Sequence, residues 1–159
     1  MEIRKYINTD LDQCLEIFDS NHPKYFTKEE RSMFIKWLDD PNREEYYVLQ
    51  NNEQVLACGG LFHDRDKKSA GLAWGMVHSK YHSMGYGTCL TNFRMEKLLT
   101  EFIDVDIKIV TSQYTVGFYE KFGFVTESIT KDGFGEGLDK YEMRKQDETV
   151  LAFIKNFFD

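Results

Sequence analysis

A glycine-rich turn between a predicted strand and a predicted helix is the first part of the sequence that could do chemistry. The segment runs from Trp74 to Thr88 and holds two glycines, Gly85 and Gly87, where the helix would begin. Glycines let the backbone approach a ligand closely, and the first N–H groups and positive dipole end of a helix favour phosphate. The segment therefore predicts an anion-binding turn, with an ordinary tight turn as the alternative.

Two common phosphate-binding motifs do not fit this turn. No Gly-Lys-Ser/Thr follows it, which excludes a Walker loop. Leu90 stands where a dinucleotide-binding fingerprint needs its third glycine. The turn is therefore neither of these two sites.

A second segment, Thr111 to Phe124, follows the next predicted strand and ends in the run Tyr119-Glu120-Lys121-Phe122-Gly123-Phe124. Together the two segments resemble the GNAT superfamily of N-acetyltransferases. The cofactor motif of that family is Arg/Gln-x-x-Gly-x-Gly/Ala at a strand-to-helix turn, followed by a helix ending in a Tyr-Glu-Lys-x-Gly-Phe-like sequence. Gly85, Gly87 and the final run match this pattern.

The resemblance implies acetyl-coenzyme A as co-substrate, bound in a wedge between two splayed parallel strands. The backbone of residues 76–78 would pair with the pantetheine arm, and the N–H groups of residues 83–88 would face the pyrophosphate. His82 replaces the first Arg or Gln of the motif, and Ser112 stands where Asn is frequent. Because a neutral imidazole still donates one hydrogen bond, we expect a weakened or altered phosphate contact at His82. The implied cofactor-binding residues are Met76, Val77, His82, Ser83, Met84, Gly85, Tyr86, Gly87, Thr88 and Ser112.

The implied reaction is direct attack of an amine on the thioester carbonyl in a ternary complex. The oxyanion needs a donor, for which the Val77 N–H is a candidate. The departing thiolate needs a proton, which in this family commonly comes from a tyrosine at the position of Tyr119. Helical spacing alone would instead make Tyr119 a residue that packs the helix onto the sheet. The resemblance reverses that preference.

A base is also required, because an alkyl ammonium has a pKa of about 10 in water and must lose a proton before it attacks. His78, at the end of the predicted cofactor strand, is our candidate, since histidine titrates near neutral pH. His63, Glu127 and a water relay stay open. For each of these side chains a solvated or structurally bonded role is the commoner one.

The sequence leaves the acceptor open between an amine of a small molecule and an amine of a peptide. A function of another class also stays open: a non-catalytic domain of the same fold that binds an acyl-coenzyme A or a partner protein. The departure at His82 and the lack of an obvious base keep this alternative open. Tyr119 and the intact glycine turn argue against it.

Hydrophobic periodicity predicts the elements that must position these segments, in the order βααβββαβαββ plus a C-terminal helix. This is a mixed α/β fold in which helices flank a central GNAT-like sheet of about seven strands. The predicted strands are Glu2–Ile7, Tyr46–Leu49, Val55–Phe62, Ala70–Val77, Val105–Val110, Phe124–Thr130 and Lys140–Lys145. Helices are predicted to begin near Thr9, at a Thr27/Glu30 capping box and at Gly85, with a short helix over Tyr114–Phe122.

Apolar residues in 146–159 predict an appended amphipathic helix. Phe153, Phe157 and Phe158 would pack it on its own sheet, and a homodimer contact is the alternative. A glycine-rich turn is predicted over Asp132–Gly137, between the last two strands.

Composition limits the classes of function. The 159 residues are 42% hydrophobic and carry a formal net charge of −7. We therefore expect one cytoplasmic domain, 1–159, with no general affinity for nucleic acid or an anionic membrane surface, because both need a basic face. Cys14, Cys58 and Cys89 form no CxxC pair and lie near no His cluster. Reduced, mostly buried thiols are expected, and no metal site.

Overall fold

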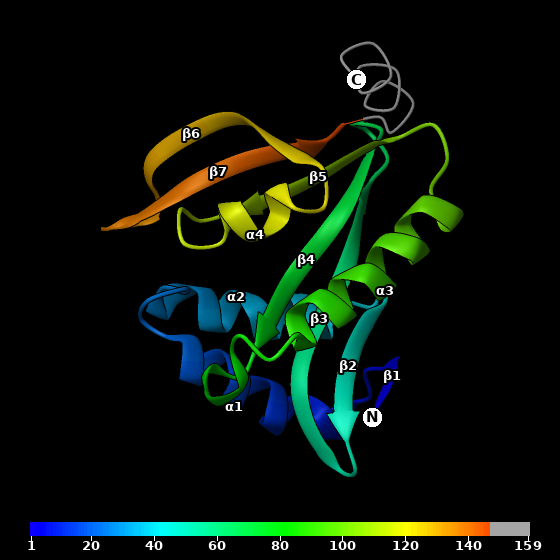
Figure 1. Ribbon diagram of the computed structural model, residues 1–159, viewed down its shortest axis with the longest axis vertical. Helices are drawn as coiled ribbons and strands as arrows, with labels where there is room; N and C mark the ends of the chain where they lie inside the picture. Colours follow the sequence, from blue (N-terminus) through cyan, green and yellow to red (C-terminus); the bar gives the residue numbers. More distant parts are fainter. Residues whose placement is uncertain (147–159) are drawn as a thin grey trace. The chain divides into compact units, whose positions relative to one another are not determined.

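The computed structural model describes residues 1–146 (Figure 1). The chain forms two compact units, Met1–Val105 and Asp106–Asp159. The first unit contains β1 (Glu2–Lys5), the 3-10 turn η1 (Asn8–Asp10), α1 (Leu11–Asn21), α2 (Lys28–Asp39), β2 (Tyr46–Asn51), β3 (Gln54–Asp64), β4 (Ser69–Val77), the 3-10 turn η2 (Ser79–Tyr81) and α3 (Tyr86–Glu101).

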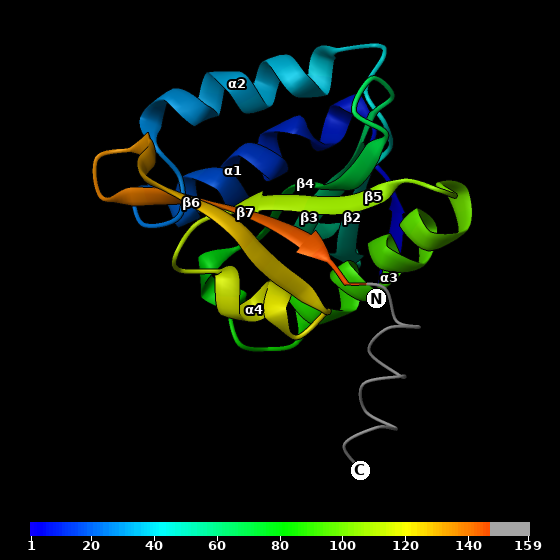
Figure 2. The ribbon, with the colours of Figure 1, turned by 90° about the horizontal axis from the view of Figure 1, so that it is seen from above.

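The four strands of the first unit are ordered β1-β2-β3-β4, and all neighbours pair antiparallel. The turn between β2 and β3 has Asn52 at φ +55, a left-handed conformation that asparagine tolerates well. Helices α1 and α2 cover one face of β2–β4, and α3 lies on the other face (Figure 2). Both faces of the central strands are therefore buried by helices.

A capping box explains where α2 begins, whereas α1 starts directly after the turn η1. Thr27 and Glu30 form the predicted capping box, in which the Thr27 N–H donates to Glu30 Oε1 at 2.9 Å. The start predicted near Thr9 is displaced, because residues 8–10 form η1 and Asp10 is the N-cap of α1. Arg4 donates twice to the Asp10 carboxylate, at 2.8 Å each, and lowers the pKa of that carboxyl.

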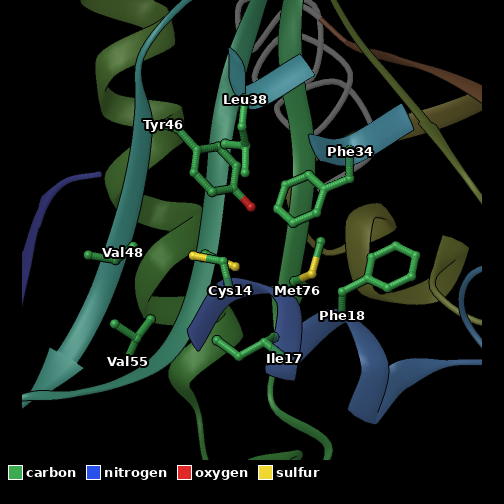
Figure 3. Close-up of a cluster of buried hydrophobic side chains, with 10 residues drawn as sticks. Cys14, Ile17, Phe18, Phe34, Leu38, Tyr46, Val48, Val55 and Met76 are labelled. Atoms are coloured by element: carbon green, nitrogen blue, oxygen red, sulfur yellow. The ribbon is translucent and has the colours of Figure 1, made fainter. Parts of the chain in front are cut away.

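An apolar cluster fills the space between α1, α2 and the sheet (Figure 3). This α1/α2-face cluster consists of Cys14, Ile17, Phe18, Phe34, Leu38, Tyr46, Val48, Val55, Cys58 and Met76. Both helices turn an apolar side towards this cluster, whereas Met33 on α2 is 57% exposed. Cys14 and Cys58 are buried, whereas Cys89 is exposed, and none of the three forms a disulfide.

The second unit contains β5 (Asp106–Thr111), α4 (Val116–Glu120), β6 (Phe124–Gly135) and β7 (Leu138–Lys145), with antiparallel strands in the order β5-β7-β6. Gly123 has φ +88 and follows the helical segment, as expected for a glycine that ends a helix. The helix itself is shorter than predicted, because Ser112 and the residues after it form a turn before α4.

The predicted turn over Asp132–Gly137 is wrong in extent. Strand β6 continues to Gly135, and the chain reverses only at 136–137. The pairing of β6 with β7 shifts register between Thr130 and Gly135, so extra residues are absorbed as a bulge within the ladder rather than in a loop.

The described strands and α-helices follow the predicted order, and the mixed α/β class with seven strands is confirmed. The predicted terminal helix over 146–159 and its phenylalanine stripe lie outside the described residues.

Candidate active site

A β-bulge interrupts the pairing of β3 with β4. Cys58 pairs with Met76 and Gly60 with Ala73, so Trp74 and Gly75 together oppose Gly59. Trp74 has φ +49, a left-handed conformation that is unfavourable for a bulky residue. Bulges of this kind redirect the strand that contains them and are frequent beside active sites.

Beyond the bulge, the end of β4 presents one edge of its backbone away from β3. The His78 N–H donates to the Leu56 carbonyl at 2.9 Å. Because hydrogen-bonding direction alternates along a strand, the N–H and C=O of Val77 face the opposite edge. This is the backbone that the sequence predicts to contact the pantetheine arm.

The Val77 carbonyl is held by two side chains from different elements. Asn21, at the end of α1, donates from Nδ2 at 2.8 Å. His82 donates from Nε2 at 3.0 Å, since a carbonyl can only accept. Ser20 Oγ also accepts from the Ser79 N–H at 3.0 Å. The last turn of α1 therefore fixes the end of β4 and the start of the turn that follows it.

The turn after β4 leaves the beginning of α3 open. Ser83 has φ +63 and Gly85 has φ +87, and residues 83–85 are exposed. Gly85 is the N-cap of α3 and has no side chain that could cap the first N–H groups of the helix. A Cβ built on Gly85 would meet nothing within 4 Å among the described residues. The predicted anion-binding turn therefore has free space in front of a sixteen-residue helix.

His82, which the sequence predicts to contact phosphate, bonds the backbone of its own chain in the structure. Its Nε2 is committed to the Val77 carbonyl, and the edge of its ring meets Tyr25, with centroids 5.5 Å apart. Only Nδ1 is left for another partner. His82 thus joins the turn to β4, a role for which the sequence offers no signal.

The two histidines considered as bases lie in different surroundings. His78 is partly buried, and its Nδ1 accepts from the Lys80 N–H at 3.2 Å. His63 Nδ1 lies 3.9 Å from Glu44, and its ring is 4.7 Å from that of Phe102. Along β3, His63 is roughly 20 Å from Ala57, the partner of Val77, at about 3.3 Å per residue. Of the two, only His78 adjoins the proposed cofactor strand.

Two predicted site residues lie in the second unit. Tyr119, on α4, is 7% exposed, with its ring edge-on to Phe118 at 5.0 Å and to Phe124 at 6.2 Å. Ser112 is 5% exposed, and its Oγ accepts from the Tyr114 N–H at 3.3 Å. Within this unit, Ser112 therefore shapes the turn that starts α4, and Tyr119 packs beside the start of β6. The third open base candidate, Glu127, has a half-exposed carboxylate 3.9 Å from Arg144.

Asn21 is a residue of the candidate site that sequence reasoning misses in the first unit. It is 4% exposed and belongs to no motif, and its partner Val77 is remote in sequence. Within residues 1–146, no group of three or more His, Cys, Asp or Glu side chains could hold a metal ion. In the same part of the chain, none of the helices is long and apolar enough to cross a membrane.

The sequence profile of the acetyltransferase (GNAT) family matches residues 11–124. The chain therefore belongs to the GNAT family of acetyltransferases, and it is an acyltransferase by class. Among curated proteins, no sequence matches it significantly.

Solved structures share the fold at low sequence identity. The ribosomal-protein-S18-alanine N-acetyltransferase from Escherichia coli superposes with a TM-score of 0.75 and 18% identity, covering 91% of this chain and 92% of that one. The ribosomal-protein-alanine N-acetyltransferase from Brucella melitensis gives 0.74 and 20%, covering 91% and 99%. An aminoglycoside 6'-N-acetyltransferase in complex with coenzyme A gives 0.69 and 14%, covering 91% and 96%. These similarities establish the fold.

Proposed function

We propose that this protein transfers the acetyl group of acetyl-coenzyme A to a primary amine by direct attack in a ternary complex. The observation that carries the proposal is the uncapped N-terminus of α3 behind Gly85, next to a strand end whose Val77 backbone faces away from β3. In a member of an acetyltransferase family, these two features fit the two halves of the co-substrate. We also propose that both units form one acetyltransferase domain, 1–159, active in the cytoplasm.

The diphosphate of the co-substrate fits the turn by its charge and by the space available. The N–H groups of residues 83–88 and the positive end of the α3 dipole attract an anion without any net positive charge on the protein. This explains how a chain with a formal charge of −7 could bind a polyanion. His82 contributes through Nδ1 or by holding the turn against Val77. Ser112 acts as a shaping residue of the turn before α4.

The pantetheine arm and the thioester fit the exposed edge of β4. An extended amide chain can pair with a strand edge through backbone hydrogen bonds. Within residues 76–78, Val77 presents its N–H and C=O to that edge, whereas the His78 N–H is bonded to Leu56 of β3. The Val77 N–H is the proposed donor to the oxyanion, because a fixed backbone amide stabilises charge that develops on a carbonyl oxygen. Asn21 and His82 hold the Val77 carbonyl and so fix the Val77–His78 peptide, which adjoins the peptide that carries this N–H.

The proton transfers are assigned to Tyr119 and His78. Tyr119 is proposed to protonate the departing thiolate, a role that rests on the family resemblance. His78 is proposed as the base for the ammonium, because it adjoins Val77 and its ring is not fully buried. Its Nδ1 must release the Lys80 N–H to take the proton, since the other ring nitrogen carries the hydrogen in that tautomer. Tyr119→Phe should lower kcat by about 100-fold and change the KM for acetyl-coenzyme A far less, since a general acid acts in the transition state. Unchanged turnover in steady-state assays would remove Tyr119 from the mechanism.

The acceptor is proposed to be an amine of a small molecule or of a peptide. Neighbours with the same fold are named for both kinds, a ribosomal-protein alanine and an aminoglycoside. A non-catalytic domain that binds an acyl-coenzyme A or a partner protein is the second candidate. The bond from the Lys80 N–H to His78 Nδ1 favours it, because that nitrogen then has no free lone pair with which to act as a base.

Two measurements on the full chain separate these functions. Calorimetry with acetyl-coenzyme A tests binding, and release of free coenzyme A thiol with a panel of small amines and peptides tests transfer. Binding with amine-dependent thiol release supports the acetyltransferase. Binding without turnover on any amine supports the second candidate, and absence of binding contradicts both.

A further inference from the structure

Arg94, on α3, is a buried cation with which no carboxylate of the described residues forms an ion pair. It is 2% exposed, and its guanidinium carries a positive charge. Nη1 donates to the Gly60 carbonyl at 3.3 Å and Nη2 to Thr91 Oγ1 at 3.4 Å, while Nε has no partner among the described residues. In the same part of the chain no carboxylate forms an ion pair with it. Burying such a group costs stability, so filling the core is a poor explanation for it.

The guanidinium occupies space that two glycines leave open. A Cβ at Gly59 would lie 2.7 Å from Arg94 Nη1, and a Cβ at Gly75 would lie 2.6 Å from Nη2. Atoms do not pack that closely, so any other residue at either position would displace the guanidinium. Gly75 belongs to the β4 bulge and Gly59 is the residue opposite it. Arg94 therefore lies directly on the bulge.

Tyr46 holds the same bulge from the other face of the sheet. Its ring belongs to the α1/α2-face cluster (Figure 3), and its hydroxyl donates to the Trp74 carbonyl at 2.8 Å. Burial raises the pKa of the Tyr46 phenol well above its ordinary value, so it remains a neutral donor. The Tyr46 hydroxyl therefore bonds the bulge from the α1/α2 face of the sheet, and the Arg94 guanidinium covers it from the α3 face.

The bulge decides where the Val77 backbone points. Trp74, at φ +49, is strained, so the bulge needs support from its surroundings. Loss of the bulge would shift the pairing by one residue, and such a slip turns each side chain and each N–H to the opposite side of the strand. The Val77 N–H would then face β3 instead of the edge assigned to the co-substrate.

We propose that Arg94 is a positioning residue for acetyl transfer. Its guanidinium, opposed by Tyr46, holds the β4 bulge and thereby aims the Val77 N–H at the thioester carbonyl, a role that rests on the proposed function. Arg94 touches neither substrate. Its contribution is therefore expected in kcat and in the order of the β4 backbone, and only weakly in the affinity for acetyl-coenzyme A.

The test compares Arg94→Met and Arg94→Lys with Leu98→Ala in the full chain. Leu98, 0% exposed, lies one turn further along α3, so its truncation weakens the packing of the helix without touching the bulge. Amide hydrogen exchange is followed by NMR at His78, whose N–H is bonded across the bulged ladder, and at Val48 on β2 as reference. Steady-state kinetics with the best amine of the panel give kcat and KM, and calorimetry gives the Kd for acetyl-coenzyme A.

Arg94→Met is expected to speed His78 exchange relative to Val48 and to lower kcat by about 10- to 100-fold, because misplacing a reacting group by about 1 Å has effects of that size. The KM and Kd for acetyl-coenzyme A should change less than about 3-fold, and Arg94→Lys should restore part of kcat through a donor to Gly60. Leu98→Ala should lower thermal stability and leave kcat and the exchange ratio unchanged.

The proposal is overturned if Arg94→Met behaves as Leu98→Ala does, losing stability with an unchanged exchange ratio and kcat. If Arg94→Met does not fold, Arg94→Lys and Gly75→Ala take its place, since a Cβ at Gly75 also displaces the guanidinium. If the wild-type protein acetylates no amine, the proposed function fails. The exchange ratio at His78 then still decides whether Arg94 holds the bulge.

Discussion

Two glycine turns of this molecule share a backbone conformation and differ in how their polar groups are satisfied. Gly85 has φ +87 and Gly137 has φ +78, and a Cβ at either would meet nothing within 4 Å among the described residues. At Gly137 the N–H donates to Asp132 Oδ1 at 2.8 Å, and the carbonyl accepts from Gln113 Nε2 at 2.9 Å. At Gly85 the next N–H groups open a helix whose N-cap has no side chain.

The two turns differ in whether side chains of the protein bond their backbone groups. Side chains of the second unit bond both the N–H and the carbonyl of Gly137, so neither group is left to bind a ligand. The N–H groups that follow Gly85 need water or an anion, because a helix cannot satisfy its first donors internally. The chain therefore contains one glycine turn that side chains close and one that our proposal assigns to the co-substrate.

The largest difference between the two turns is expected when a negative charge is placed at each glycine. Gly85→Asp should weaken acetyl-coenzyme A binding by more than about 100-fold, because a carboxylate about 4 Å from a phosphate costs about 4 kcal/mol at an effective dielectric of about 20. Aspartate tolerates the left-handed conformation, so the protein should still fold. Calorimetry measures the change. Gly137→Asp is the matched control, and an equal loss of affinity in both variants would refute the distinction between the turns.

Removal of the His82 tether should have a smaller effect on the same turn. His82→Ala takes away one hydrogen bond to the Val77 carbonyl, and the affinity for acetyl-coenzyme A should fall by about 3- to 10-fold. His63→Ala, the same change at the distant end of β3, should leave the affinity unchanged. If His82→Ala binds as the wild type does, the turn is held without this contact.

Thiol labelling can locate bound co-substrate near the first turn of α3. Cys89 is exposed there, whereas Cys14 and Cys58 are buried, and a side-chain hydrogen bond that the Cys14 thiol donates to Cys58, together with burial, raises the pKa of Cys14. One thiol should therefore react fast with a maleimide, and acetyl-coenzyme A should slow that reaction several-fold. Mass spectrometry of the labelled peptides identifies the site. Fast labelling of Cys89 that saturating acetyl-coenzyme A leaves unchanged would place the ligand elsewhere.

The smallest expected effect belongs to the structural turn. Asp132→Ala removes the acceptor of the Gly137 N–H and should lower the free energy of unfolding by about 0.5–1 kcal/mol, since the bond is exposed. Urea unfolding measures this loss. The affinity for acetyl-coenzyme A should not change, and a parallel loss of affinity would show that this turn takes part in binding.

Sequence reasoning succeeds here where neighbouring residues decide the structure. The Thr27/Glu30 capping box is local, and so is the start of α3 at Gly85. The turn at 132–137 is misjudged because glycines there serve a bulge, and only the pairing with β7 decides between a bulge and a loop.

The features of the site that the sequence does not reveal depend on distant partners. Asn21 reaches Val77 across fifty-six positions, and Arg94 reaches Gly60 across thirty-four. An arginine within an amphipathic helix is ordinarily solvated. The residues that make room for the buried Arg94 are Gly59 on β3 and Gly75 on β4, which are distant from it in the sequence. Such contacts arise from the sheet register, which periodicity alone does not define.

The most direct test of the central claim is an NMR titration of the ¹⁵N-labelled protein with acetyl-coenzyme A, following individual backbone amides. The account predicts large, saturable shifts for Gly85, Tyr86 and Gly87 at the start of α3 and for Val77 at the end of β4, and none at Gly137. Saturable binding that leaves the amides of Gly85, Tyr86 and Gly87 unshifted would contradict it.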